Sequence, residues 1–264
     1  MRRPEAKISG VRTLILASPR IGSLLFILGL SATVMLGLNS PANAFLVLVP
    51  NRAALGATDF IDWGVLGPPF TTVSNPFSIA SNGGGTNATL SMPNSGGFTR
   101  LDQQQPPATS AWAGSFAPGD HLLWTSLENN GPITIEFANP VFGAGAQIEK
   151  DFFSPGSPRA FTATLDVYDT SNALLAEYIL PGFAHYGHDN TAIFLGVKDS
   201  TADIKRIVFS TSDANPLNDF AINQLSLVNT AVPEPSSLLL AASGLSGLVG
   251  VKALRHRRRK VLVA

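Results

Sequence analysis

The sequence lacks cysteine altogether, and only 14% of its 264 residues are charged. Without cysteine the chain has no disulfide framework, no thiolate zinc site and no thiol nucleophile. Hydrophobic residues make up 45% of the chain, which is enough for a folded core. The length fits one domain of barrel size or at most two small domains.

The net charge of zero conceals a separation of charge along the chain. Residues 1–44 carry five Lys or Arg against one Glu, and residues 252–260 carry six Lys or Arg and no acid. Residues 45–231 hold seven basic and sixteen acidic residues, a net charge of −9. Because phosphate binding needs a basic face, this acidic segment argues against nucleic acid as a partner.

The beginning of the chain has the pattern of a secretory signal peptide. A basic stretch precedes an apolar run over residues 21–38, and residues 39–44 end in Ala-Asn-Ala, a small-x-small pattern. We predict a signal peptide over residues 1–44, with cleavage by signal peptidase after Ala44. An uncleaved membrane anchor is the alternative, because about 18 apolar residues can span a bilayer.

A second apolar stretch covers residues 236–254, with Lys252 as its single charge. A helix of this length rises about 28 Å, close to the apolar thickness of a membrane. A basic cluster follows directly, formed by Arg255, Arg257, Arg258, Arg259 and Lys260. Since cationic residues stay cytoplasmic, the pattern predicts a transmembrane helix with its tail inside and the acidic segment outside.

Pro233, Glu234 and Pro235 stand immediately before this stretch. Proline keeps such a segment extended, as a protease cleft requires. The motif, the apolar helix and the basic cluster together, residues 232–264, resemble the PEP-CTERM sorting signal, a tail also catalogued as an ice-binding-protein C-terminal domain. The resemblance implies processing by an exosortase, a membrane protease of Gram-negative bacteria that often make exopolysaccharide. It also implies an inner-membrane intermediate and a final place at the cell surface or outside the cell.

Residues 45–231 show short β-rich runs separated by Gly, Pro, Asn and Ser, and no amphipathic helix pattern. The alternation is clear in residues 161–168, where Ala163, Leu165 and Val167 share one face. We therefore predict an all-β, jelly-roll-like sandwich as one ectodomain. The region 64–127 is expected to be irregular, with two or three edge strands. The expected strands are 45–49, 59–63, 132–137, 161–168, 174–180, 192–197, 204–210 and 220–228.

The ectodomain itself is similar to a recurrent domain of PEP-CTERM proteins with a galactose-binding-like fold. The similar stretches are residues 59–67, 116–124, 131–137, 143–148, 192–197 and 220–227. In that fold a structural calcium often joins the first and last strands. The resemblance therefore implies a calcium site built from Asp59, Asp62, Asp219 and Asn223, with Asn223 weakening it where related domains often have Asp. The alternative is that these side chains are solvated or cap strand ends.

Aromatic side chains offer a second kind of site, because sugars stack on exposed rings. Trp112 lies in a loop-like segment and is our candidate for a glycan contact. Core packing is the alternative for any Trp in a β protein, and we expect it for Trp63 and Trp124.

Catalytic patterns are weak. His185, His188 and Asp189 form a polar cluster, but their spacing fits no common zincin, and Glu149 and Asp151 are a carboxylate pair in sequence only. There is no Gly-x-Ser-x-Gly elbow. We therefore predict a non-enzymatic, exosortase-sorted surface or matrix protein associated with exopolysaccharide or biofilm, with no cofactor beyond a structural calcium. A secreted hydrolase and a calcium-dependent carbohydrate-binding module are the alternatives.

Overall fold

The computed structural model describes residues 45–93, 96–104, 112–126, 131–151, 159–212 and 219–230. The signal peptide expected over residues 1–44 lies outside these residues. So does the tail of residues 232–264, with its Pro-Glu-Pro motif, apolar stretch and basic cluster, and these assignments stay predictions. Within the described ranges, no helix has both the length and the apolar character needed to cross a membrane.

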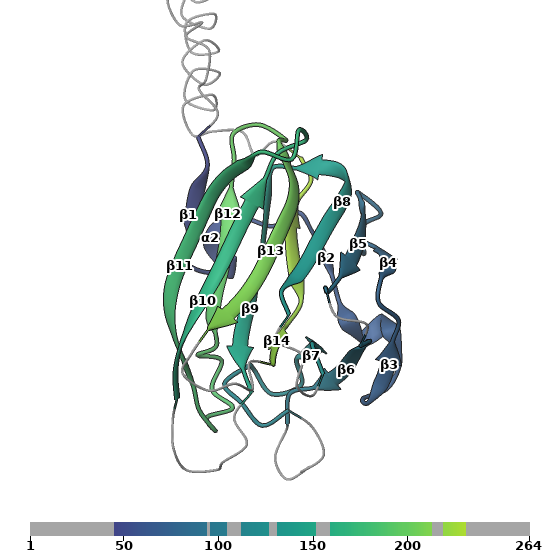
Figure 1. The fold of residues 1–264 in the computed structure, drawn as a ribbon, viewed down its shortest axis with the longest axis vertical. Helices are drawn as coiled ribbons and strands as arrows, with labels where there is room; N and C mark the ends of the chain where they lie inside the picture. Colours follow the sequence, from purple (N-terminus) through teal and green to yellow (C-terminus); the bar gives the residue numbers. More distant parts are fainter. Residues whose placement is uncertain are drawn as a thin grey trace, which may run out of the picture. The chain divides into compact units, whose positions relative to one another are not determined.

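Two antiparallel β-sheets form the described part of the chain (Figure 1). The first sheet has the order β1 (Val47–Val49), β12 (Ile193–Lys198), β9 (Gly143–Lys150), β14 (Phe220–Ile222), β7 (His121–Trp124), β6 (Phe98–Asp102) and β3 (Thr71–Val73). Two further strands belong to it, since β15 (Leu225–Val228) pairs with both β9 and β2 (Asp59–Ile61). The second sheet has the order β11 (Leu174–Ala184), β10 (Arg159–Tyr168), β13 (Ile204–Ser212), β8 (Ile133–Val141), β5 (Asn87–Ser91) and β4 (Phe77–Ala80).

The core fills the space between the two sheets, because alternate residues of each strand face inward. On β10, Ala163, Leu165 and Val167 are fully buried, which confirms the face predicted from their alternation. Inward-facing residues of β9 and β8 join the same cluster, among them Ile148 and Ile135. The all-β class predicted from the sequence is confirmed.

Strand β9 is buried along its whole length, so it is covered on both faces. Ala144, Ala146 and Ile148 contribute to the core between the sheets. Gln147 and Glu149 alternate with them, and Glu149 accepts hydrogen bonds from Ser115 in a segment that crosses the outer face. A polar layer therefore lies over the outside of the first sheet, and the candidate site is built there.

The predicted strands 59–63 and 220–228 are each interrupted in the structure. After β2, the side chain of Asp62 accepts a hydrogen bond from Gly64 N at 3.0 Å and starts a 3-10 turn, η1 (Trp63–Leu66). The second stretch is divided into β14 and β15, with Asn223 between them, and Asn223 uses its side chain to bind neighbouring segments. A polar side chain that bonds the backbone ends the regular ladder at both places.

The region 64–127 is more regular than its composition indicates. Its described residues contain strands β3 to β7. β3 and β4 each lie at the edge of a sheet, as the expectation of two or three edge strands has it, whereas β5, β6 and β7 have strand neighbours on both sides. Their partners include β8 and β14, which are distant in sequence. Periodicity within a short strand does not reveal such pairing.

Candidate functional site

Arg52 is the charged residue around which the polar groups of the first sheet gather. It opens the single helical turn α2 (Arg52–Leu55). Its Nη1 donates to Ser226 Oγ at 2.6 Å and to the backbone oxygen of Gln224 at 3.0 Å, and its Nη2 donates to Asn223 Oδ1 at 2.8 Å. Burial lowers the pKa of Arg52, while attraction to Asp120 opposes that shift. The guanidinium group thus ties α2 to the last two strands.

The side-chain amide of Asn223 both accepts and donates hydrogen bonds. Its Oδ1 accepts from Arg52 and from Gln147 N, the latter at 2.9 Å. Its Nδ2 donates to Asp120 Oδ2 at 2.8 Å and to Gln147 Oε1 at 2.6 Å. An aspartate at this position would place a carboxylate oxygen next to the acceptor oxygens of Asp120 and Gln147, with no hydrogen to share between them. The amide is therefore the group that this position requires, which gives Asn223 a structural reason independent of any cation.

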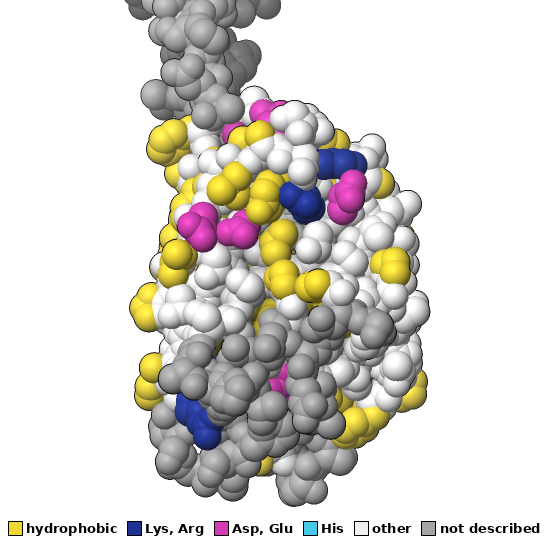
Figure 2. Space-filling view, in the orientation of Figure 1, with side chains coloured by type: hydrophobic (Ala, Val, Ile, Leu, Met, Phe, Trp, Pro, Cys, Tyr) yellow, Lys and Arg dark blue, Asp and Glu magenta, His cyan; other side chains and the backbone are white. Residues whose placement is uncertain are grey.

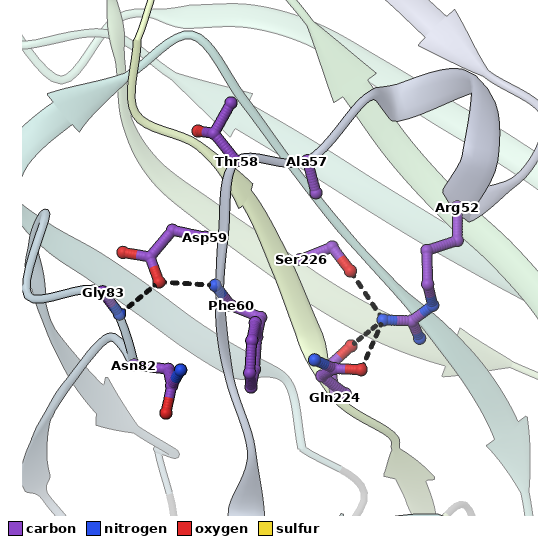
Figure 3. Close-up of a pocket in the computed structure, with 9 residues that line it drawn as sticks. All are labelled: Arg52, Ala57, Thr58, Asp59, Phe60, Asn82, Gly83, Gln224 and Ser226. Carbon is purple, nitrogen blue, oxygen red and sulfur yellow. Dashed lines mark hydrogen bonds between the residues drawn. The ribbon is translucent and has the colours of Figure 1, made fainter.

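A hollow of about 370 Å³ lies on one side of Arg52 (Figure 3). Arg52 and Asp59 stand on opposite sides of it, and Phe60 lies between them. Asn82, Gln224 and Ser226 also line it. The hollow thus combines a cation, an anion, amides and one aromatic ring.

The Asp59 carboxylate in this hollow is occupied by protein donors. Gly83 N donates to it at 2.7 Å, Phe60 N at 2.8 Å and Asn229 Nδ2 at 2.8 Å, and Ser81 Oγ donates as well. Burial acts to raise the pKa of Asp59, but the hydrogen bonds from Ser81 and the backbone amides outweigh it and hold the pKa below its ordinary value. Asp59 therefore fastens the glycine loop after β4 to strand β2.

Arg52 also lines a second, larger hollow of about 660 Å³. Residues from four places in the sequence line it, namely Asn51, Arg52, Gln147, Phe183, Asn190 and Phe194. The Arg52 guanidinium lies 5.8 Å from the centre of the Phe194 ring, a cation–π arrangement. Phe183 is 54% exposed at this hollow. We call this hollow the Arg52–Phe183 groove.

Gln147 holds one wall of the Arg52–Phe183 groove in place. Its Nε2 donates to Asn190 Oδ1 at 2.9 Å and to the backbone oxygen of Ala192 at 3.0 Å. Asn190 has a φ of 63° and His188 a φ of 49°, both in the left-handed region that non-glycine residues rarely occupy. Strained backbone of this kind often accompanies binding sites.

The four residues implied as calcium ligands each have separate protein partners. Asp62 Oδ1 lies 2.7 Å from His121 Nδ1, and Asp219 Oδ2 accepts from Trp124 Nε1 at 3.1 Å. Burial raises the pKa of Asp219. Asp59 and Asn223 make the contacts given above. Across the residues that the structure describes, no three His, Asp or Glu side chains group closely enough to hold a metal ion.

Trp112 is packed in a small cluster rather than at the surface. It is 5% exposed, and its ring centre lies 6.2 Å from that of Phe116 and 6.3 Å from that of Trp124. Its Nε1 donates to Glu149 Oε2 at 3.3 Å. The ring therefore does not offer the exposed face that stacking on a sugar requires. Trp63 is fully buried, as expected.

Glu149 is a fully buried carboxylate beneath the 112–116 segment. It accepts from Ser115 N at 2.7 Å and Ser115 Oγ at 2.8 Å, and from His185 N at 3.3 Å. Burial raises its pKa to about 7 against the opposing effect of these hydrogen bonds. Ser115 Oγ also lies 3.0 Å from the backbone oxygen of His185, so its hydrogen can turn there when Glu149 is protonated.

The two histidines of the 185–189 cluster have different partners. His185 Nε2 lies 3.0 Å from Thr191 Oγ1 and 3.8 Å from Asp189 Oδ2. His188 Nδ1 instead lies 2.7 Å from Gln103 Nε2. The contacts of the cluster hold the loop after β11, which borders the Arg52–Phe183 groove.

The sequence reasoning missed Arg52, Gln147 and Asn190. Arg52 carried a usable signal, because it is one of only seven basic residues in the segment 45–231. Gln147 and Asn190 carried no such signal in the sequence. Their roles depend on strand pairing and on the path of the loop after β11, and no local sequence pattern encodes either.

The fold and the groove thus define a β-sandwich protein with polar hollows over its first sheet. Residues 231–259 match the family model of the PEP-CTERM protein-sorting motif, so the chain carries this sorting motif. The motif implies export by way of an exosortase to the cell surface or a membrane. A comparison with curated proteins finds no match.

Three solved structures are similar to parts of this chain. A DUF4465 family protein from Bacteroides caccae is 16% identical at a TM-score of 0.34 and covers 69% of this chain and 99% of its own. The enzymatically active domain of bacteriophage CBA120 tailspike protein 4 is 12% identical at 0.27 and covers 53% and 19%. The C-terminal family 22 carbohydrate-binding module of Clostridium thermocellum Xyn10B is 11% identical at 0.19 and covers 70% and 100%. Likenesses of this degree are too loose to transfer any property to this chain.

Proposed function

We propose that this chain is exported, processed by an exosortase and displayed at the cell surface or in the matrix, where its β-sandwich binds exopolysaccharide without catalysing a reaction. The observation that carries the proposal is the sorting motif at residues 231–259. The apolar stretch and the basic cluster that follow the Pro-Glu-Pro segment support it, because they have the order that a processed membrane intermediate needs.

A binding role without catalysis is supported by the state of the titratable groups. Glu149, the carboxyl with the pKa of an acid–base catalyst, is fully buried behind Ser115 and Trp112 and has no open side toward a substrate. The polar side chains that line the Arg52–Phe183 groove are three amides, one guanidinium and the hydroxyl of Thr191. Such groups bind the hydroxyls and oxygens of sugars, and a net charge of −9 keeps the domain soluble outside the cell.

Cell fractionation of the native host tests the sorting step. We compare the wild-type chain with Glu234→Ala and with a deletion of residues 232–264. We expect the wild type at the surface or in the medium at a reduced mass, Glu234→Ala retained in the membrane at its full mass, and the deletion variant released without tail processing. Glu136→Ala is the matched control, because Glu136 is an exposed glutamate of the sandwich, and it should behave as the wild type.

The same compartment and the same mass for the wild type, Glu234→Ala and the deletion variant would overturn the sorting proposal. Fractions that differ, combined with turnover of a glycan or ester panel by the purified protein, would instead support the secreted hydrolase.

A further inference from the structure

We infer that the Arg52–Phe183 groove binds an acidic sugar residue of a polysaccharide, through amide and guanidinium hydrogens and without a metal ion. This inference deepens the proposed function and rests on it. The groove is open, about 660 Å³ in volume, and combines rings with polar side chains. Ligand sites of proteins commonly have this combination of apolar wall and few polar groups.

Among the asparagine and arginine side chains that line the groove, the atoms that bond no other described residue are donors. Asn190 and Asn51 each use the side-chain oxygen inside the protein, the first for Gln147 Nε2 and the second for Ala54 N. Their Nδ2 groups make no hydrogen bond to another described residue. Both asparagines are exposed. Both Nη atoms of Arg52 donate hydrogen bonds to the segment 223–226. Its Nε makes no hydrogen bond to another described residue. A ligand that satisfies this wall must present acceptor oxygens.

The charge of the groove selects among such ligands. Arg52 is the one charged residue that lines it, and no described Asp or Glu does so. The smaller hollow, which Arg52 also lines, differs in this respect, because the Asp59 carboxylate borders it. Of the two hollows that Arg52 lines, the Arg52–Phe183 groove is therefore the one that offers a sugar carboxylate a cation without an acid beside it, although residues 45–231 as a whole are acidic. At physiological salt the Debye length is about 8 Å, so the repulsion between the bound carboxylate and acids farther away than this is largely screened.

The rings of the groove distinguish a sugar from a simple anion. Phe183 is 54% exposed, and Phe194 lies beneath the Arg52 guanidinium. A pyranose has an apolar face of C–H groups and an edge of oxygen atoms. An exposed aromatic ring can contact the face, and amide donors beside the ring can bind the oxygen atoms. The ring of Phe183 supplies the apolar contact, and Asn190 and Arg52 hold the carboxylate.

Isothermal titration calorimetry of the full-length chain in a mild detergent tests this inference. The probes are hexagalacturonate, neutral cellohexaose and polyglutamate, each at 0.15 M salt with EDTA. We expect hexagalacturonate to bind and the other two to bind at least tenfold more weakly.

Two variants have matched controls. Asn190→Asp sets a carboxylate in the donor wall and should weaken hexagalacturonate binding about tenfold, since like charges a few ångströms apart repel. Asn172→Asp adds the same charge at an exposed asparagine of similar φ, 67°, outside the groove, and should leave binding unchanged. Phe183→Ala should weaken binding about fivefold, whereas Ile179→Ala, which removes an equally exposed side chain of the same strand, should not.

Several results would overturn the inference. Equal binding of cellohexaose would show that the acid is not recognised, and equal binding of polyglutamate would assign the groove to acidic peptides. Loss of binding in EDTA would assign the contact to a bridging cation. Equal losses for Asn190→Asp and Asn172→Asp would reduce the effect to overall charge. Cell fractionation distinguishes this inference from the sorting proposal. A chain that is sorted as expected but does not bind hexagalacturonate would contradict only the groove inference. A chain that binds hexagalacturonate but is not sorted would contradict only the sorting proposal.

Discussion

Glu149 connects the stability of the sandwich to pH through a single buried carboxyl. Its pKa is raised to about 7 because it is buried, whereas in the unfolded chain it titrates near 4.5. Between these two values the folded state holds a proton that the unfolded state has already released, so stability falls as pH rises. We expect the free energy of unfolding to drop by about 3 kcal/mol from pH 4.5 to pH 7.5 through this residue.

Urea unfolding at several pH values measures this loss, with tryptophan fluorescence as the signal, since the three tryptophans all lie in the sandwich. Glu149→Gln should remove most of the decline with pH, because the amide does not titrate. Glu136→Gln, at an exposed glutamate, should keep it. A Glu149→Gln variant whose stability falls with pH as steeply as the wild type would show that other groups carry the effect.

At the scale of single elements, the contact between β9 and β12 depends on glycine. A Cβ added at Gly145 would lie 2.5 Å from the Cα of Gly196 and 2.8 Å from the Phe194 ring. The backbone atoms cannot move aside without separating two strands in the middle of the first sheet. We expect Gly145→Ala to lower the free energy of unfolding by about 3 kcal/mol, as overpacked core positions do.

Chemical denaturation of the two alanine variants provides the comparison. Gly84→Ala is the control, because a Cβ there meets nothing within 4 Å and bears only the strain of a φ of 69°. It should lose about 1 kcal/mol. Equal losses at both glycines would mean that backbone conformation, rather than the close approach of the strands, sets the cost.

Sequence periodicity predicts those elements of this fold that alternate over many residues. Strand β10 is such a case, since its inward face at Ala163, Leu165 and Val167 could be read directly from the pattern. Short strands such as β6 and β7 could not be placed, because their burial comes from partners far along the chain. The same holds for the candidate site. Asp59, predicted as a calcium ligand, lines the smaller hollow and accepts hydrogen bonds there, and its calcium role stays a prediction. Gln147 acquires its role only when β9 meets the loop at Asn190.

On the scale of the whole molecule, the sequence places opposite charges in separate segments. Residues 45–231 have a net charge of −9, and the segment 252–260 has six cations. The apolar stretch of residues 236–254 lies between them. In the proposed membrane intermediate this division favours one orientation, because moving an Arg or Lys through the bilayer centre costs about 2.5–3.5 kcal/mol on insertion scales.

The orientation can be tested by changing the basic cluster alone. We replace Arg255, Arg257, Arg258, Arg259 and Lys260 with asparagine in a chain that carries an epitope tag at its end. In spheroplasts treated with protease, the tag of the unchanged chain should stay protected on the cytoplasmic side, and most of the variant's tag should be digested, because the cations no longer hold the tail inside. Serine substitutions at Val261, Leu262 and Val263 change the same region without changing its charge and should keep the tag protected. If the asparagine variant is protected as well, the cluster does not set the topology, and the acidic ectodomain must be kept outside by its signal peptide alone.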